Sequence, residues 1–392
     1  MSTPENSLIV GMGGVCAAGK GCSAILESFG AGRREAAPPT VFRSSLRYPV
    51  FEVSSFTHDS RLMRTLALAY AALEEACEQA RLPADLGGMR TGVVMGTTVA
   101  SQLNDEAWYG RYREKKGSSV SELEPYFKGN LAGAIASKVG STGPAVTVVN
   151  ACSSGADALG IAYDWLSCGV CDLVIAGGAD ELNHVPYCGF GALSVTSASP
   201  CRPFDKQRSG LNLGEGAGIM VLERPGHAHG RGMESDLFLA GFGAASDAYH
   251  LTAPRPNGEG LTRAIQEALR RAGCESADIA FINAHGTATR DNDAAEGGVI
   301  ARLFGREQVF LSTKGYTGHT LGAAGALEAV FTALALREGW VPQSIGFTQE
   351  DESIGVAPVA EKTAVSGNFA LSTSLAFGGN NAAVVIKREP CS

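Results

Sequence analysis

The sequence predicts an α/β protein built from two successive halves of similar order. Strand-like apolar segments alternate with helix-like segments along the chain, and the alternation starts again near Leu237. Two of the helix-like segments are rich in Ala and Gly and carry few charges, so they must be covered on all sides. We therefore expect a central helix layer between two sheets, with one half at 1–236 and the other at 237–392.

The first half contains apolar runs of strand length and three segments with helical character. Strands are expected at 8–13, 91–98, 145–149, 172–180 and the end of 204–223. Helices are expected at 61–80, 131–140 and 151–166. We expect the charged stretch 101–119 to be irregular and the residues that follow 180 to form a long loop.

The second half repeats this order with strands that alternate with helices. Strands are expected at 237–245, 279–286, 309–315, 369–377 and 381–389. Helices are expected at 260–273, 292–304 and 321–336. The helices at 151–166 and 321–336 are the two small-residue segments.

Composition excludes several functional classes. With 392 residues, 45% of them hydrophobic and 18% charged, the chain has the composition of a globular protein. A net charge of −8 and no visible basic stripe argue against nucleic-acid binding. No apolar run has the length of a membrane span, and no basic region precedes the first apolar stretch. We expect a cytoplasmic protein whose ten cysteines are reduced thiols.

Two short motifs match known patterns but lack the rest of their sites. Gly14 to Lys20 fits the phosphate-loop pattern GxxxxGK, yet Gly21 stands where the magnesium-binding hydroxyl should be. Cys168 and Cys171 form a CxxC pair that follows a helix instead of opening one, and no second ligand pair stands at zinc-site spacing. We expect neither nucleotide nor metal to bind.

Cys152 lies where the strand 145–149 gives way to a small-residue helix. A helix start presents unpaired N–H groups and the positive end of the helix dipole, which favour a thiolate. The alternative is that a small hydrophobic residue fills a tight turn. Position alone leaves both interpretations open, but if Cys152 is the nucleophile we expect its sulfur to be held ionised.

Three later segments also deliver polar residues at the ends of apolar strands. His285 lies at the end of the strand 279–286, while Lys314 and His319 lie on the turn before the second small-residue helix. Phe377 stands beside a glycine pair. Strand ends are where sites assemble in α/β proteins, although a lone histidine there is more often structural.

Taken together, these motifs resemble those of the elongating β-ketoacyl-acyl-carrier-protein synthases of the thiolase superfamily. The likeness covers nearly the whole chain in order, through ACSSG, CRPFDKQRSGLNLGEGAG, SDAYHLTAP, NAHGTAT, STKGYTGHTLGAAGALE and AFGGNN. It implies a thiolase-like five-layer α-β-α-β-α fold made of two similar halves. The first half would carry the nucleophile, and the second would carry the His, Lys and His residues.

The resemblance also implies a decarboxylative condensation. Cys152 would take an acyl group from acyl carrier protein, and malonyl carrier protein would then lose CO₂ and attack the thioester. His285 and His319 would stabilise the enolate, and the backbone N–H groups of Cys152 and Phe377 would form the oxyanion hole. Lys314 would fix the protonation of the histidines.

Supporting residues follow from the same likeness. Glu328 is the expected partner of Lys314, whereas Asp293 and Glu296 are expected to anchor loops. Thr287 and Thr289 would bind the pantetheine arm that carries the substrate, so no diffusible cofactor and no metal are expected. Carrier proteins of this kind are acidic, which gives five basic residues a use in docking: Arg61, Arg64, Arg202, Lys206 and Arg208.

The chain departs from the family pattern at four positions. Asn380 stands where Thr is usual, and Ala376 replaces a Gly before Phe377, which predicts a stiffer gating turn. Asn292 and Arg290 replace a Gly and a Pro, so the loop that carries His285 is expected to differ in shape.

Two alternatives remain open beside the condensing enzyme, which is expected to be a homodimer. A thiolase that uses free coenzyme A would need a second cysteine in the glycine loop, and LAFGGNN has none. A subunit of a ketosynthase/chain-length-factor heterodimer would usually lack the nucleophile, whereas this chain keeps Cys152. Acyl chain length, and fatty acid as against polyene or polyketide synthesis, are not decided by the sequence.

Overall fold

A computed structural model describes residues 7–54, 56–57, 62–99, 103–123 and 130–389. Two five-stranded sheets, in the orders β4-β3-β5-β6-β1 and β7-β13-β12-β8-β9, are linked by two residue pairs between β1 and β7. In addition, β2 pairs with β1, and β10 pairs with β11. The strands are β1 (Ser7–Cys16), β2 (Gly19–Lys20), β3 (Thr91–Gly96), β4 (Ala145–Val148), β5 (Leu173–Asp180), β6 (Gly216–Glu223), β7 (Leu237–Ser246), β8 (Ile279–Asn283), β9 (Phe310–Leu311), β10 (Trp340–Val341), β11 (Thr363–Ala364), β12 (Phe369–Ala376) and β13 (Asn380–Arg388).

The two sheets have the same topology. Each strand of the first sheet has an equivalent in the second, with the same order and the same parallel and antiparallel neighbours. The equivalent pairs are β1 and β7, β6 and β13, β5 and β12, β3 and β8, and β4 and β9. The main elements of each half follow the order β-α-β-α-β-α-β-β. This repetition supports our proposal of a boundary at 236/237, next to the start of β7.

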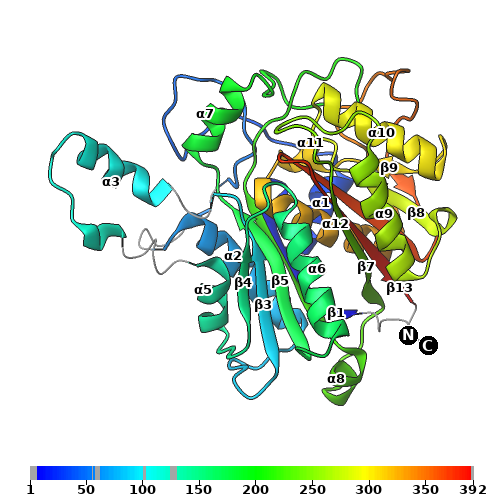
Figure 1. Cartoon of the computed structure of the whole chain (residues 1–392), viewed down its shortest axis with the longest axis horizontal. Helices are drawn as coiled ribbons and strands as arrows, with labels where there is room; N and C mark the ends of the chain where they lie inside the picture. The colour runs from blue at the N-terminus through cyan, green and yellow to red at the C-terminus, as the bar shows by residue number, and fades with distance from the viewer. Residues whose placement is uncertain (1–6, 55, 58–61, 100–102, 124–129, 390–392) are drawn as a thin grey trace.

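Helices separate and cover the sheets in five layers, as the thiolase-like fold requires (Figure 1). The outer layers contain α2 and α5 on the first sheet and α9 and α10 on the second, while α6 and α12 lie between the sheets. The helices are α1 (Cys22–Gly30), α2 (Arg64–Gln79), α3 (Leu103–Arg113), α5 (Leu131–Lys138), α6 (Ser154–Ser167), α7 (His184–Ala192), α8 (Pro225–Gly230), α9 (Glu259–Ala272), α10 (Arg290–Phe304), α11 (Lys314–Thr317) and α12 (Ala324–Glu338). Short 3₁₀ turns occur at η1 (Val120–Leu123), η2 (Ser276–Asp278) and η3 (Leu321–Ala323).

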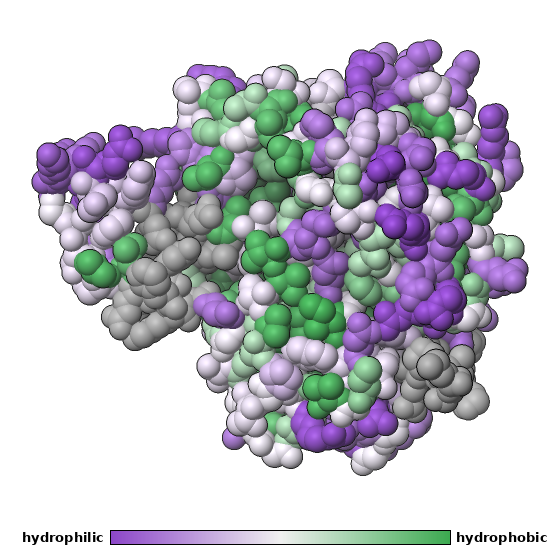
Figure 2. Space-filling model, viewed as in Figure 1, coloured by the Kyte–Doolittle hydropathy of each residue, from purple (hydrophilic) through white to green (hydrophobic). Residues whose placement is uncertain are grey.

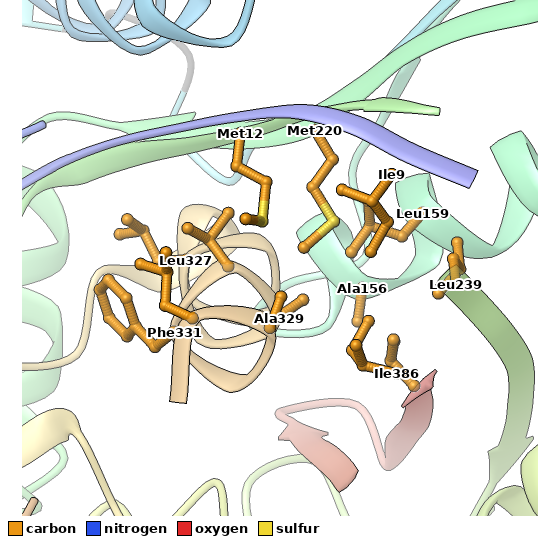
Figure 3. Close-up of a cluster of buried hydrophobic side chains, with 14 of the residues drawn as sticks. Ile9, Met12, Ala156, Leu159, Met220, Leu239, Leu327, Ala329, Phe331 and Ile386 are labelled. Atoms are coloured by element: carbon orange, nitrogen blue, oxygen red, sulfur yellow. The ribbon is translucent and has the colours of Figure 1, made fainter. Parts of the chain in front are cut away.

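The central layer is packed through small residues, as the Ala- and Gly-rich pattern predicts. A Cβ at Gly155 of α6 would lie 2.8 Å from the main-chain nitrogen of Ala326 in α12. A Cβ at Gly325 would lie 2.8 Å from the main-chain nitrogen of Ala156. Figure 3 shows Met12 and Met220 reaching down from the first sheet onto these helices, with Ile386 of the second sheet below them. The two halves therefore meet through closely packed helices.

The structure differs from the sequence-based expectation at several helices. Helix α3 forms in the stretch expected to be irregular, and α7 lies within the expected long loop. Figure 1 shows α3 away from the body of the molecule, so packing against the core does not impose an apolar repeat on its sequence. Helix α6 begins at Ser154, three residues later than expected.

The phosphate-loop match is a β-hairpin. Gly14 and Cys16 pair with β6, β2 pairs back onto β1, and the Gly21 N–H donates to the Gly14 carbonyl at 2.7 Å. These backbone groups are therefore not free to cradle a phosphate. Cys168 is exposed at the end of α6 and Cys171 is buried, and both are free thiols.

We predict that Gly325→Ala destabilises the protein, because the added methyl group forces α6 and α12 apart. The expected loss is about 1–3 kcal/mol, measured as a lower midpoint of urea unfolding. Gly298→Ala in α10 is the matched control, since a Cβ there meets no atom within 4 Å. The control should be neutral or stabilising by up to about 1 kcal/mol. Equal midpoints for the two variants would contradict this account of the central layer.

Candidate active site

Cys152 lies on a strained turn between β4 and α6. The residue before it, Ala151, has a φ of +50°, which is rare for a residue with a Cβ. The Ser154 hydroxyl donates to the Ala151 carbonyl at 2.6 Å and accepts from the Asn150 N–H at 2.8 Å. These two bonds hold the turn, and strain of this kind is concentrated at functional sites. Cys152 is only 5% exposed.

Residues from both halves line one cavity of about 320 Å³ around Cys152. His285 reaches it from the loop after β8, His319 from the turn after α11, and Phe377 from the turn between β12 and β13. Lys314 is not part of the lining, because it lies behind His285. The four chemically important side chains thus gather at one place, with the amine one layer further from the cavity.

The two histidines present N–H groups to the cavity. The Leu321 N–H donates to His319 Nδ1 at 3.3 Å, and Lys314 Nζ lies 3.0 Å from His285 Nδ1. Because each Nδ1 accepts a hydrogen bond, we assign the ring proton of both residues to Nε2. Burial, together with the Lys314 charge, holds the pKa of both imidazoles well below the ordinary value. Both rings are therefore neutral donors at physiological pH.

Lys314 is held in place by the side chain of Glu328 from α12. The Lys314 ammonium donates to Glu328 Oε1, and both side chains are almost fully buried. Burial raises the pKa of Glu328 to about 7, against the lowering effect of Lys314. This is the partner that the family resemblance implied for Lys314.

The sulfur of Cys152 is not held ionised, contrary to our expectation from the helix start. Burial raises the pKa of Cys152 to about 11, although the Phe377 N–H and Lys314 both act to lower it. The desolvation of an enclosed sulfur outweighs the field of the helix terminus. The resting nucleophile is therefore a thiol at neutral pH.

Two backbone amides face the sulfur. The N–H of Phe377 and the N–H of Cys152 itself both act to lower the pKa of this sulfur, which places them close to it. Phe377 stands on a three-residue turn between paired Ala376 and Asn380, and Gly378 and Gly379 take φ values of +92° and +82° there. Glycine at these two positions lets the turn bring the Phe377 amide up to the nucleophile.

Two buried carboxylates anchor the loop that carries His285. Glu296 accepts from the main-chain N–H groups of His285 and Gly286, both at 2.8 Å. Asp293 accepts from the N–H of Phe204 at 2.7 Å and from the N–H of Ala288 at 3.1 Å. Neither carboxylate lines the cavity, so both act on the shape of the loop.

The departures at Asn292 and Arg290 have different consequences. The Asn292 side chain donates to Asp293 Oδ1 at 3.1 Å and so becomes part of the anchor. Arg290 begins α10 as an exposed residue at the rim of the cavity. Thr287 and Thr289 line the same wall, with their hydroxyl oxygens 2.9 Å apart.

The structure corrects part of the expected docking surface. Arg64 forms a buried ion pair with Glu215, and Arg208 is 4% exposed and pairs with Asp351 at 2.6 Å. Both arginines are structural, because each guanidinium is paired with a carboxylate of the same molecule. Arg61 lies outside the described residues. Arg202 is half-buried and forms a long ion pair with Asp205 at 3.9 Å, whereas Lys206 is exposed. These two are the accessible members of the set that the structure describes.

Sequence reasoning missed two residues that shape the site. Asp180, fully buried at the end of β5, accepts from the Gly322 N–H at 2.6 Å and from the Thr98 N–H at 2.9 Å. An acidic residue at the end of an apolar strand was the available signal. Phe190 of α7 stacks on Phe377 with ring centroids 5.5 Å apart, and no sequence pattern indicated this contact.

The described part of the chain carries neither a membrane-spanning helix nor a cluster of metal ligands. None of its helices has the length and apolar character needed to cross a bilayer. Within the same residues, His, Cys, Asp and Glu side chains do not gather in groups of three or more that could hold a metal ion.

Comparisons with known proteins bear on this site. Family models for the β-ketoacyl synthase N-terminal and C-terminal domains match residues 49–228 and 238–348. The 3-oxoacyl-[acyl-carrier-protein] synthase 2 of Staphylococcus aureus (strain N315) is 35% identical over 344 residues, which cover 84% of this chain and 82% of the relative. The protein of the same name from Rhizobium meliloti (strain 1021) is 37% identical over 349 residues, with 84% and 81% covered.

Solved structures of ketosynthases have the same fold as this chain. A chain of the ishigamide ketosynthase/chain length factor superposes with a TM-score of 0.91 at 30% identity, covering 98% of this chain and 100% of that one. A β-ketoacyl synthase from Burkholderia phymatum STM815 gives 0.89 at 31% identity with the same coverage. A ketosynthase in complex with its chain length factor from Xenorhabdus doucetiae gives 0.85 at 28% identity, with 99% of each chain covered.

We predict that alkylation of Cys152 by iodoacetamide accelerates steadily with pH, because only the thiolate reacts. With a pKa raised to about 11, the rate should rise about tenfold per pH unit from about pH 7 to about pH 10. Peptide mass spectrometry measures the rate at each pH. The exposed Cys168 is the internal control for reagent reactivity. A rate at Cys152 that levels off below about pH 8 would show an ionised resting sulfur.

Proposed function

The chain belongs to the β-ketoacyl synthase family, and from that premise we propose how its residues carry out the reaction. The protein is a β-ketoacyl-acyl-carrier-protein synthase, an acyltransferase that performs a decarboxylative condensation. The observation that supports the proposed roles is the arrangement of two donor pairs around Cys152. The amides of Cys152 and Phe377 face the sulfur, while the Nε2–H groups of His285 and His319 face the same cavity.

The first step transfers the acyl group to Cys152. The sulfur attacks the thioester carbonyl of the acylated carrier, and the two amides stabilise the negative charge on the carbonyl oxygen. The carbon–sulfur bond to the pantetheine then breaks, and the departing thiolate takes up the proton lost by Cys152. Since Cys152 rests as a thiol, this proton transfer is part of the step and not a preliminary to it.

The second step uses the histidines. Malonyl carrier protein places its thioester oxygen between the Nε2–H groups, loses CO₂, and leaves an enolate that those groups stabilise. The enolate carbon attacks the Cys152 thioester and the bond to the sulfur breaks, which gives β-ketoacyl carrier protein. The departing Cys152 thiolate then takes a proton from solvent and returns to the thiol. Neutral imidazoles suit this step, because a donor that keeps its proton does not quench the carbanion. The Lys314 charge supports that neutral state.

Binding of the carrier follows the wall of the cavity. We propose that Thr287 and Thr289 hydrogen-bond the pantetheine arm and that Arg202 and Lys206 meet an acidic surface of the carrier protein. The substrate arrives attached to this arm, so no metal or diffusible cofactor is proposed. A cytoplasmic location remains a proposal that rests on the sequence.

We further propose a homodimer formed through the outer edge of β4. This edge strand has no neighbour on its outer side among the described residues. Val146 within it and Val149 just after it are 39% and 66% exposed. Figure 2 shows apolar side chains in the centre of the face on which Figure 1 places β4. Pairing of two such edges would bury them.

A heterodimer with a chain-length-factor subunit is the second candidate. It is favoured by the high TM-scores against ketosynthase/chain-length-factor structures, and it would place the protein in polyene or polyketide synthesis and not in fatty acid synthesis. A coenzyme A-dependent thiolase is disfavoured, because the turn from Ala376 to Asn381 offers no second cysteine.

We predict that intact-protein mass spectrometry detects an acyl adduct after incubation with acyl carrier protein substrates. Cys152→Ala should abolish the adduct, whereas Cys168→Ala, which removes an exposed thiol, should leave it unchanged. His285→Ala or His319→Ala should slow CO₂ release from malonyl carrier protein by about 10²–10³, the usual cost of losing one such donor. An adduct that survives Cys152→Ala, or histidine variants with full CO₂ release, would contradict these roles.

We predict that sedimentation velocity finds a dimer of the pure protein and that Val146→Lys converts it to a monomer. A lysine ammonium on each of two paired edges would be buried against the other. Val170→Lys, which changes another exposed valine on the turn before β5, is the control and should leave the dimer intact. A wild-type monomer that dimerises only after a second subunit is added would favour the heterodimer.

A further inference from the structure

A chain of side-chain hydrogen bonds connects the Phe377 turn to the Cys152 turn. Asn380 Nδ2 donates to Asn150 Oδ1 at 2.5 Å, and Asn150 Nδ2 donates to Asp157 Oδ2 at 2.6 Å. These three residues come from the start of β13, the turn before the nucleophile, and the first turn of α6. None of them lines the cavity, so the reaction described above gives them no role.

The hydrogen-bond chain has a fixed direction. The Asp157 carboxylate only accepts when ionised, and it receives both the Asn150 amide and the Ser153 hydroxyl, the latter at 2.8 Å. Asn150 must therefore turn its nitrogen to Asp157 and its oxygen to Asn380. A carboxylate in the first turn of a helix is also favoured by the helix dipole. Asp157 thus orients Asn150, and Asn150 in turn fixes Asn380.

These hydrogen bonds connect the turn that carries Phe377 to the turn that carries Cys152, and the amides of both residues face the sulfur. Asn380 pairs with Ala376 across the β12–β13 hairpin, so it closes the three-residue turn that carries Phe377. Asn150 forms a β-bridge with Cys152. A shift of Asn380 relative to Asn150 would move the Phe377 amide relative to the Cys152 amide.

We propose that Asn380 is a positioning residue for acyl transfer, and that its bond to Asn150 sets the spacing of the two amides of the oxyanion hole. The inference rests on the role proposed for these amides. It concerns a position at which the chain departs from the family pattern, where Thr is usual. A Thr hydroxyl ends one bond nearer the main chain than the Asn amide, so it does not reach Asn150 without a shift of the hairpin.

Acyl transfer and decarboxylation should respond differently to the loss of this bond. The first step uses the Cys152 and Phe377 amides, whereas CO₂ release uses His285 and His319. Those histidines are held by Lys314 and by the Leu321 amide, which make no bond to Asn380 or Asn150. A positioning role therefore predicts a loss in the first step alone.

The test compares Asn380→Thr, Asn150→Ala and the double variant in two assays. One is single-turnover acylation of Cys152, followed by quenched-flow mass spectrometry. The other is CO₂ release from malonyl carrier protein by acyl-free enzyme, which also reports on folding of the site. Asn368→Ala, an exposed asparagine at the opposite end of β12, is the matched control.

Each single variant should slow acylation by about 10- to 100-fold, which is the effect of a small misplacement of reacting groups. The double variant should be no slower than either single variant, because both remove the same bond. CO₂ release should stay within about twofold of wild type, as the control should in both assays. Wild-type acylation in Asn380→Thr, or an equal fall in both activities, would overturn the inference. Failure of the wild-type protein to acylate would instead overturn the proposed function and this inference with it.

Discussion

The chemistry of the site depends on one buried charge, the ammonium of Lys314. It lies between the carboxylate of Glu328 and Nδ1 of His285, in a place that water does not reach. Burial and, after it, the Lys314 charge lower the pKa of both imidazoles, and the position of the ammonium fixes the tautomer of His285. Burial and this charge together keep the two imidazoles neutral, and the Leu321 amide fixes the tautomer of His319.

The packing of α6 against α12 brings the charge and the nucleophile together. Cys152 precedes α6, and His319 precedes α12, while the Asp180 carboxylate binds the Gly322 amide just before that helix. Because glycines let the helices approach closely, residues from two different halves meet in one cavity. The duplicated architecture thus contributes the nucleophile from one half and the donors from the other.

The sequence predicted elements and site residues correctly where local periodicity or a motif determines them. Alternating apolar segments indicated the two halves, and strand ends marked Cys152, His285 and His319. It failed where the role of a residue depends on a partner that lies far away in the sequence. Arg64 and Arg208 pair with acidic residues 151 and 143 positions away, so they looked free for docking. The ionisation of Cys152 was misjudged for the same reason, since burial depends on the whole fold.

The most direct test of this account is the titration of His285 and His319 by ¹⁵N nuclear magnetic resonance, with each signal assigned by its own variant. The account predicts that both rings keep the neutral, Nε2-protonated form at pH values well below the ordinary histidine pKa of about 6.5. A signal from either ring that titrates at or above about pH 6.5 would contradict it.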